Sequence, residues 1–465
     1  PMVFMDMANT DATPEPGGQD MGNDYLVQKK PLNALIIFAL PMIIGNLFQQ
    51  TYTMADSAIV GRLVGEDALA AVGASYALTN IFICIAVGGG VGASVIVSRY
   101  FGAKEYARMK LAVCTAFLSF LAVSICLAVF GLSFGRHIMQ ALNTPVDVLD
   151  MAAAYLGIYF LGLPFLFMYN VVSSMFNALG KSKIPLCFLI FSSLFNIGLD
   201  FILVKYFQMG VAGVAWATLI AQGISAVLSF LVFLYVLRNL DCGKTALFDK
   251  KELSDMTKIA LPSILQQSII SIGMMLVQSV VNGFGPQALA GFSAGIRVES
   301  ICVVPMIATG NAVATFTAQN IGAGKMERVK EGYRASYGIV AGFSVIIAVI
   351  VALLNGPIIT SFLGDGMSRE AYGAGTGYLS FIAYFFVFIG MKACTDGVLR
   401  GSGDVLVFTI ANLVNLTIRV YAAFHFAPIW GVAAVWYAVP MGWIANYAIS
   451  FSRYLAGKWR DKKVI

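Results

Sequence analysis

The sequence has little charge for its length. Only 12% of its 465 residues are Asp, Glu, Lys or Arg, and 59% are apolar, whereas soluble domains carry about 25% charged residues. Apolar stretches of about 20 residues recur along the chain, which is the length that crosses a bilayer as a helix. Barrel-type alternation is absent, and only helices or closed barrels satisfy their backbone in lipid. The sequence therefore predicts an all-α integral membrane protein.

Other absences narrow the function. No G-x-x-x-x-G-K-[ST] motif occurs, which argues against ATP-driven transport by this chain. The two histidines have no metal-site spacing, and no Ser/His or His/Asp constellation is visible, so we expect neither an enzyme nor a cofactor or metal. Seven cysteines, an odd number, give no disulfide framework. The net charge of +6 is spread over short loops rather than clustered, so no nucleic-acid partner is expected.

Twelve apolar segments are long enough to be transmembrane helices. If the N-terminus is cytoplasmic, most Lys and Arg residues fall in the inside loops, which satisfies the positive-inside rule and predicts that both termini are cytoplasmic. The expected spans are 32–60, 68–97, 111–134, 152–178, 184–204, 211–237, 255–283, 288–316, 335–355, 376–399, 405–425 and 430–452.

The two halves of the chain repeat each other. The string FGAKE at Phe101 recurs as IGAGK at Ile321, and LGKSK at Leu179 recurs as LRGSG at Leu399, with the same separation in sequence for both pairs. Six helices followed by six more predict two six-helix lobes related by a parallel repeat, with a central site between them. The expected division is a disordered tail at 1–24, an N-lobe at 25–237, a cytoplasmic linker at 238–258, and a C-lobe at 259–465 with a basic C-terminal tail.

An acidic side chain lies inside the fifth span. The run FSSLFNIGLDF carries Asn196 and Asp200 four residues apart, so a helix points both to one face. A carboxylate within a membrane segment indicates an ion or proton site by default. Asp56 of the first span and Thr218 of the sixth are expected at a similar depth. These oxygens can coordinate Na⁺, or the two carboxyls can share a proton because adjacent negative charges repel.

The repeat supplies an internal comparison for this site. Asn415 aligns with Asn196, and Arg419 aligns with Asp200, so we expect the cation site in the N-lobe alone. Glu299, Asp396 and Arg419 are secondary charged candidates, with Glu299 as a reserve proton site. A substrate cavity is expected to include Gln49, Met54, Met274, Met275 and Gln278.

Several linked motifs resemble the multidrug and toxic-compound extrusion (MATE) transporters. They are ALPMIIGNLFQQTYTMADSAIVGRLVGEDALAAVGAS, SRYFGAKE, NIGLD, AQNIGAGKMERVKEG and LRGSGD. The resemblance implies two six-helix lobes around a central cavity and exchange of H⁺ or Na⁺ for drug. It also implies that Asp56, Asn196, Asp200 and Thr218 correspond to the N-lobe cation site of the prokaryotic branch.

The leading hypothesis is thus a secondary active exporter of amphipathic, mostly cationic small molecules in a prokaryotic cytoplasmic membrane. A flippase of lipid-linked precursors with a similar two-lobe plan is the alternative, and it would need a strongly basic cavity. Two complete lobes in one chain predict a functional monomer. The coupling ion stays open between H⁺ and Na⁺.

Overall fold

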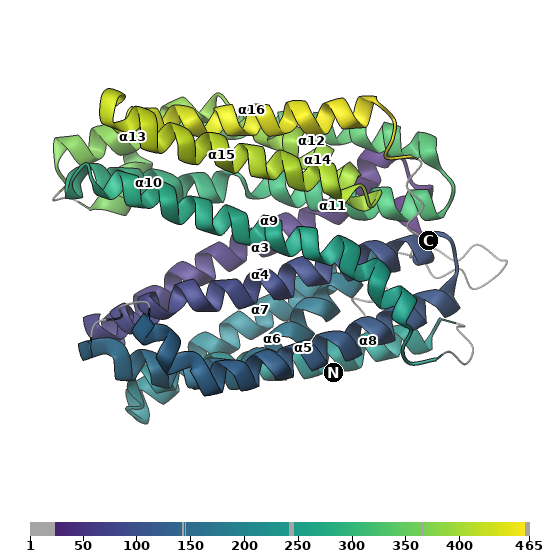
Figure 1. The fold of residues 1–465 in the computed structure, drawn as a ribbon, viewed down its shortest axis with the longest axis horizontal. Helices are drawn as coiled ribbons and strands as arrows, with labels where there is room; N and C mark the ends of the chain where they lie inside the picture. Colours follow the sequence, from purple (N-terminus) through teal and green to yellow (C-terminus); the bar gives the residue numbers. More distant parts are fainter. Residues whose placement is uncertain (1–23, 142–143, 145, 241–245, 365–366, 461–465) are drawn as a thin grey trace. The chain divides into compact units, whose positions relative to one another are not determined.

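The computed structural model describes residues 24–141, 144, 146–240, 246–364 and 367–460, and within these ranges it contains helices and no strand (Figure 1). The expected N-terminal tail, except for Asp24, and the end of the basic C-terminal tail at 461–465 lie outside the described residues. The helices are α2 (Tyr25–Gln28), α3 (Pro31–Leu63), α4 (Glu66–Gly102), α5 (Tyr106–Ala141), α6 (Val146–Ala178), α7 (Lys183–Asp200), the π-helix η1 (Phe201–Tyr206), α8 (Gly210–Arg238), α9 (Lys250–Asn282), α10 (Pro286–Cys302), α11 (Val304–Gly322), α12 (Met326–Leu363), α13 (Arg369–Ala383), α14 (Phe386–Gly401), α15 (Val405–Trp430) and α16 (Ala433–Leu455).

The apolar helices number slightly fewer than the sequence predicts. Among the described residues, ten spans are long and apolar enough to cross a membrane, with Pro286–Gly322 counted as one. The pair α13 and α14, bent by 54° at a short break, makes an eleventh. The twelfth expected span corresponds to α16, which has 23 residues but is not among these spans. Its Trp, Tyr and Asn side chains lower its hydropathy.

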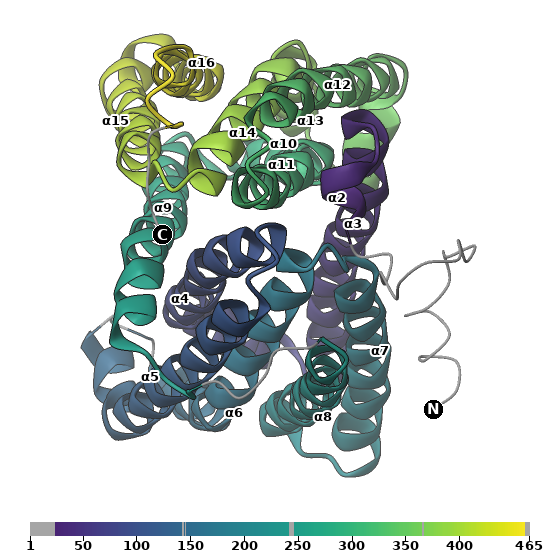
Figure 2. The same cartoon turned by 90° about the vertical axis from the view of Figure 1, so that its right-hand side faces the viewer.

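The two halves of the chain pack in the same pattern. In the first half, α4 packs on α6, α6 on α8, and α7 on α8. In the second half, α10 packs on α13, α11 on α14, α14 on α16, and α15 on α16, and Figure 2 shows α15 and α16 side by side. Each broken pair in the second half thus takes the place of one continuous helix in the first. This correspondence is the parallel repeat that the sequence motifs predict.

Each half has its own apolar core. Phe82, Phe160 and Phe167 are central in the first, and Phe292 and Phe386 are central in the second. The aromatic rings meet edge to face, as Phe82 and Phe160 do at 5.5 Å between ring centroids, which is the favoured geometry for such pairs.

Two helices are divided between the compact units of the fold. Unit 1 comprises residues up to Tyr25 and Ile44–Ile264, and unit 2 comprises Leu26–Ile43 and Leu265–Ile465. The divisions therefore fall inside α3 and α9, at repeat-related positions close to Pro41 and Pro262. A proline inside a helix removes a backbone hydrogen bond and favours a kink. The linker expected at 238–258 lies elsewhere, because it begins at the end of α8 and includes the first turns of α9; its residues 241–245 lie outside the described residues.

Repeat-related residues hold the start of each divided helix. In unit 1, Tyr100 donates to Glu252 near the start of α9 at 2.7 Å, and Arg108 lies over the Tyr100 ring. At the corresponding positions of unit 2, Arg328 donates to Asn320 at 3.0 Å and to the Lys29 carbonyl at 2.7 Å. The contacts differ in chemistry, but the same two repeat positions make them. They anchor the leading end of α9 to unit 1 and the segment before α3 to unit 2.

Glycines let the first part of α9 approach α4 within unit 1. A Cβ built on Gly92 would lie 2.6 Å from the Ala260 backbone, and one on Gly88 would lie 2.6 Å from the Ile264 backbone. Real Cβ atoms do not approach backbone this closely, so these positions require glycine.

We predict that Gly92→Val destabilises the fold by about 1–3 kcal/mol, because the added methyl groups overpack a backbone contact. The measurement is the thermal melting midpoint of the purified protein in detergent. Gly73→Ala on the same helix is the control, since a Cβ there meets nothing within 4 Å. Equal melting midpoints for the two variants would contradict the close-packing argument.

Candidate ion-coupling site

The last turn of α7 carries the two polar side chains that the sequence singled out. Asp200 is fully buried and Asn196 is 2% exposed, although both lie in an apolar helix. Leu194 and Phe195, on other faces of this turn, are exposed, as expected for residues that meet lipid. The chain continues directly into the π-helix Phe201–Tyr206, a rare geometry that is frequent at functional sites.

The neighbouring helix α3 supplies a second carboxyl group. The carboxyl groups of Asp56 and Asp200 lie close enough to interact electrostatically. One turn earlier on α3, the Tyr52 hydroxyl lies 2.5 Å from the Asn196 amide. Two carboxylates cannot hydrogen-bond to each other without a proton, because neither can donate. A shared proton or a cation between the two acids would offset their repulsion.

The amide of Asn196 links the acids to α8. In the orientation that satisfies its neighbours, the amide nitrogen donates to Tyr52 and to Asp200 Oδ2 at 3.1 Å. The amide oxygen then accepts from the Thr218 backbone N–H, also at 3.1 Å. The Thr218 hydroxyl donates to the Val214 carbonyl at 3.1 Å.

Two oxygens of the site have no hydrogen-bond donor within the described ranges. They are Oδ1 of Asp56 and Oδ1 of Asp200, and both are buried. Burying such oxygens unsatisfied costs several kcal/mol, of the order expected for charged groups out of water. Oxygen atoms from α3, α7 and α8 therefore lie around a point where a bound proton or Na⁺ would satisfy these two carboxyl oxygens.

A small pocket adjoins the site from α6 and α8. Its lining includes Tyr155, Tyr159, Thr218 and Gln222. Tyr155 interacts electrostatically with both Asp56 and Asp200. The hydroxyl and amide groups of this lining are further polar groups next to the two acids.

Comparisons with known proteins decide the family. A family model described as MatE matches residues 41–202 and again 262–424, one match for each half of the repeat. The chain belongs to the MATE family.

Two similar relatives come from Bacillus subtilis (strain 168). One is named probable multidrug resistance protein YpnP and is 30% identical over 439 residues, 94% of this chain and 98% of that protein. The other is named probable multidrug resistance protein YoeA and is 26% identical over 93% of this chain and 95% of that protein. The fold also matches a solved outward-facing structure of a multidrug resistance MATE family transporter, with a TM-score of 0.87 and 22% identity over 96% of this chain and all of that one. The sequence-based family assignment and the all-helical two-lobe fold are thereby confirmed.

This MATE chain brings its predicted coupling residues together in unit 1. Asp56, Asn196, Asp200 and Thr218 form one connected group, as expected from their depths. Sequence reasoning missed Tyr52 and Tyr155. Tyr52 could have been found, because it precedes Asp56 by four residues and therefore shares its helix face. Tyr155 gave no comparable signal, since its place depends on how α6 packs.

The predicted cavity residues lie at the surfaces of their own units. Gln49 and Met54 are exposed on the unit 1 part of α3. Met274 and Met275 are exposed on the unit 2 part of α9, where Gln278 is half-buried. Their substrate-binding role stays a prediction.

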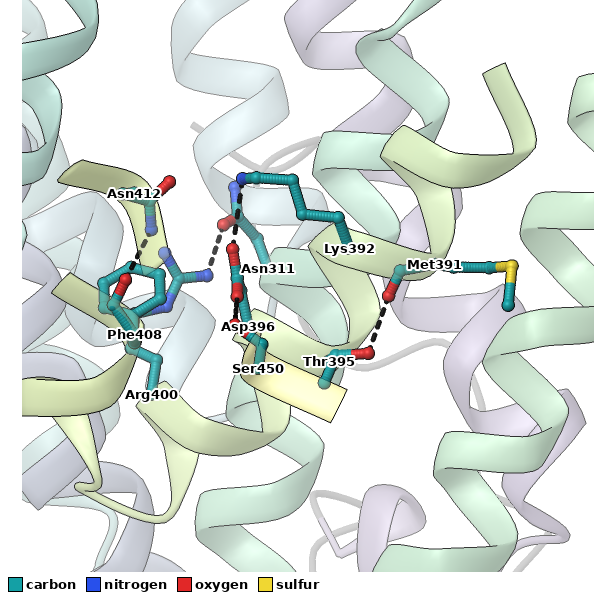
Figure 3. Close-up of polar contacts among 9 residues, drawn as sticks. All are labelled: Asn311, Met391, Lys392, Thr395, Asp396, Arg400, Phe408, Asn412 and Ser450. Atoms are coloured by element: carbon teal, nitrogen blue, oxygen red, sulfur yellow. Dashed lines mark hydrogen bonds and ion pairs between the residues drawn. The ribbon is translucent and has the colours of Figure 1, made fainter. Parts of the chain in front are cut away.

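One of the secondary charged candidates is paired within unit 2 (Figure 3). Asp396 forms an ion pair with Lys392 at 3.1 Å and accepts from the Ser450 hydroxyl at 2.6 Å. Arg400, one turn further along α14, donates to Asn311 at 2.6 Å. Because its oxygens already have donors, Asp396 fits mutual neutralisation better than ion coupling. Within the described ranges, no group of three His, Cys, Asp or Glu side chains could hold a metal ion.

We predict that Asn196→Ala weakens ion binding at Asp56 and Asp200 roughly ten-fold, because loss of the amide leaves buried partners unsatisfied at about 1–3 kcal/mol. The measurement is the ion concentration that gives half-maximal transport in proteoliposomes. Thr51→Ala on α3 is the control, since Thr51 is exposed and bonds only its own helix at the Leu47 carbonyl. An unchanged half-maximal concentration in Asn196→Ala would remove Asn196 from the site.

Proposed function

We propose that the protein is a secondary active multidrug exporter, in which H⁺ or Na⁺ bound at Asp56 and Asp200 is exchanged for amphipathic, mostly cationic small molecules. The observation that carries the proposal is the closeness of the buried Asp200 carboxyl group and the half-buried Asp56 carboxyl group in a MATE fold. The names of the similar proteins support the substrate class, because both are named probable multidrug resistance proteins. They give no support to the lipid-linked precursor flippase.

The coupling step follows from electrostatics at the acid pair. With a proton or Na⁺ bound, the pair carries less negative charge and holds α3 against α7. When the ion leaves, two carboxylates a few ångströms apart repel by several kcal/mol in a medium of low dielectric constant. Movement of the unit 1 part of α3 away from α7 then lowers this repulsion. The kink that Pro41 favours is the place where α3 can bend. Ion binding thus biases the protein between two access states.

The same site explains why either ion is suitable. Asp56, Asp200, Asn196 and Thr218 offer only oxygen ligands, which hard cations prefer. A proton needs only the two carboxyls. We propose that the chain is a multi-pass protein of a prokaryotic cytoplasmic membrane, that it works as a monomer, and that both termini are cytoplasmic, in keeping with its basic loops.

We predict that an imposed pH gradient or Na⁺ gradient drives a fluorescent organic cation across proteoliposomes containing the wild type, and that Asp200→Asn abolishes this driven transport. Asn keeps the size of the side chain but cannot change its charge. The gradient that works identifies the ion. Asp150→Asn is the control, because Asp150 is an exposed acid paired with Arg136.

Full gradient-driven transport in Asp200→Asn would contradict the proposal. Loss of transport in Asp150→Asn as well would show that the assay reports general damage rather than coupling.

A further inference from the structure

Unit 2 carries a cluster of positive charges at the end where α12 begins and α16 stops. Arg334 of α12 and Arg460, which follows α16, both lie close enough to Glu327 and Tyr454 to interact with them electrostatically. Lys330 of α12 forms an ion pair with Glu327 at 2.5 Å. Three cationic side chains therefore lie around a single carboxylate.

This one acid cannot neutralise the cluster. It is paired with the lysine, and within the described residues neither Arg334 nor Arg460 forms an ion pair. Both arginine side chains are exposed. The neighbouring Glu331 and Lys458 are exposed too and add one charge of each sign. A positive excess therefore remains at this end of unit 2, and it is available to an anion.

The chain folds back after α16 and fixes the position of Arg460. Gly457 makes the turn, with a φ of 72° that favours glycine. Trp459 is 1% exposed, and its indole N–H donates to the Tyr454 carbonyl at 3.0 Å. The two rings stack at 5.6 Å between centroids, and the Tyr454 ring lies 4.1 Å from that of Tyr333 on α12. Arg460 lies over the Trp459 ring at 5.4 Å, so a packed aromatic stack holds this exposed arginine.

The repeat indicates that helix packing does not require the arginine of α12. With the separation that relates Arg108 to Arg328, Arg334 aligns with Cys114 of α5. Unit 1 thus has a neutral side chain at the same helix position. The charge of Arg334 is a feature of unit 2 alone, which favours a role in binding over a role in folding.

The cluster lies where two exposed helix sides end. On α12, Arg334 is followed along one side by the exposed residues Gly338, Gly342 and Val345. A Cβ built on either glycine would meet nothing within 4 Å, so the space beside the helix is open. On α16, the exposed apolar residues end at Leu455, which is 66% exposed. Figure 2 shows α14 between α12 and α16, and α14 packs on both.

We propose that this end of unit 2 binds an anionic phospholipid, with the headgroup phosphate at Arg334 and Arg460 and the acyl chains along the exposed sides of α12 and α16. Arginine forms bidentate, charge-assisted hydrogen bonds with phosphate, and basic sites at the ends of membrane helices recognise such headgroups. Tryptophan and tyrosine favour the same membrane depth, because their rings are amphipathic. The lipid site goes beyond the exporter function and does not depend on the coupling ion.

The apolar surface beside the cluster distinguishes a lipid from a soluble phosphate. A soluble phosphate would meet the two arginines and gain nothing from Leu455 or from the open side of α12. A zwitterionic lipid would gain the apolar contacts, but the positive charge of its headgroup would be repelled by the arginines. An anionic phospholipid gains both contributions, and we therefore expect it to bind most tightly.

Native mass spectrometry of the full-length protein tests the assignment, with phosphatidylglycerol as the probe and phosphatidylcholine as the zwitterionic reference. Protein freed of lipid in a neutral detergent is titrated with each lipid, and the dissociation constant of the tightest bound lipid is measured. In the wild type we expect tighter binding of phosphatidylglycerol. In Arg334→Gln/Arg460→Gln we expect that binding to weaken roughly 30-fold, because two surface cations are lost. Inorganic phosphate should not displace the lipid from the wild type.

Two variants keep the test specific. Arg238→Gln/Lys251→Gln removes two exposed positive charges from unit 1 and should leave the affinity for phosphatidylglycerol unchanged. Arg334→Lys/Arg460→Lys keeps the charges and should retain the preference for the anionic lipid. Phosphatidylglycerol should raise the melting midpoint of the wild type and of the unit 1 variant but not that of Arg334→Gln/Arg460→Gln, because a ligand stabilises only a protein that binds it. Without lipid, all these midpoints should agree, which shows that the variants fold.

Equal affinities of the wild type for the two lipids would overturn the proposal, and so would unchanged affinity in Arg334→Gln/Arg460→Gln. Equal weakening in the unit 1 variant would overturn it as well, since attraction would then follow net charge rather than this cluster. Displacement by inorganic phosphate would replace the lipid with a soluble anion. These outcomes leave the exporter function untouched, because that function is judged on gradient-driven transport and Asp200→Asn.

Discussion

The fold is constrained by the cost of burying carboxyl groups in a helix bundle surrounded by lipid. An isolated carboxylate in such a place is costly, and Asp200 is fully buried at the end of α7. Its position is tolerable because Asp56, Asn196 and the backbone of Thr218 surround it with polar groups from three helices. The cost of burial is only partly offset, because Oδ1 of Asp56 and Oδ1 of Asp200 have no hydrogen-bond donor within the described residues. These two unsatisfied oxygens favour the binding of a proton or a cation at the site.

The repeat explains how the same packing can support opposite charges. Both units pack equivalent helices in the same order. The charged side chains inside this frame differ, because unit 1 has Asp200 where unit 2 has Arg419. The packing of equivalent helices therefore does not depend on which charge stands at this position. Divided helices α3 and α9 add a second shared feature, since each starts in one unit and ends in the other.

Much of this could be predicted from the sequence, and the limits have physical causes. Apolar length and the repeated motifs predicted the helices and their order, because lipid permits few alternatives. The four-residue spacing of Asn196 and Asp200 predicted a shared face, and membrane depth placed Asp56 beside them. Periodicity alone could not reveal the division of α3 near Pro41, since it depends on tertiary contacts. The hydrogen bond from the Tyr378 hydroxyl to the Glu299 carboxyl group was hidden for the same reason.

The central claim is that ion binding at the acid pair and substrate movement are one process. The most direct test is to let substrate drive the ion, by loading proteoliposomes with an organic cation and recording the pH or Na⁺ concentration inside as the cation leaves. The account predicts ion movement opposite to the substrate in the wild type and none in Asp200→Asn. Substrate efflux without ion movement in the wild type, or equal ion movement in the variant, would contradict it.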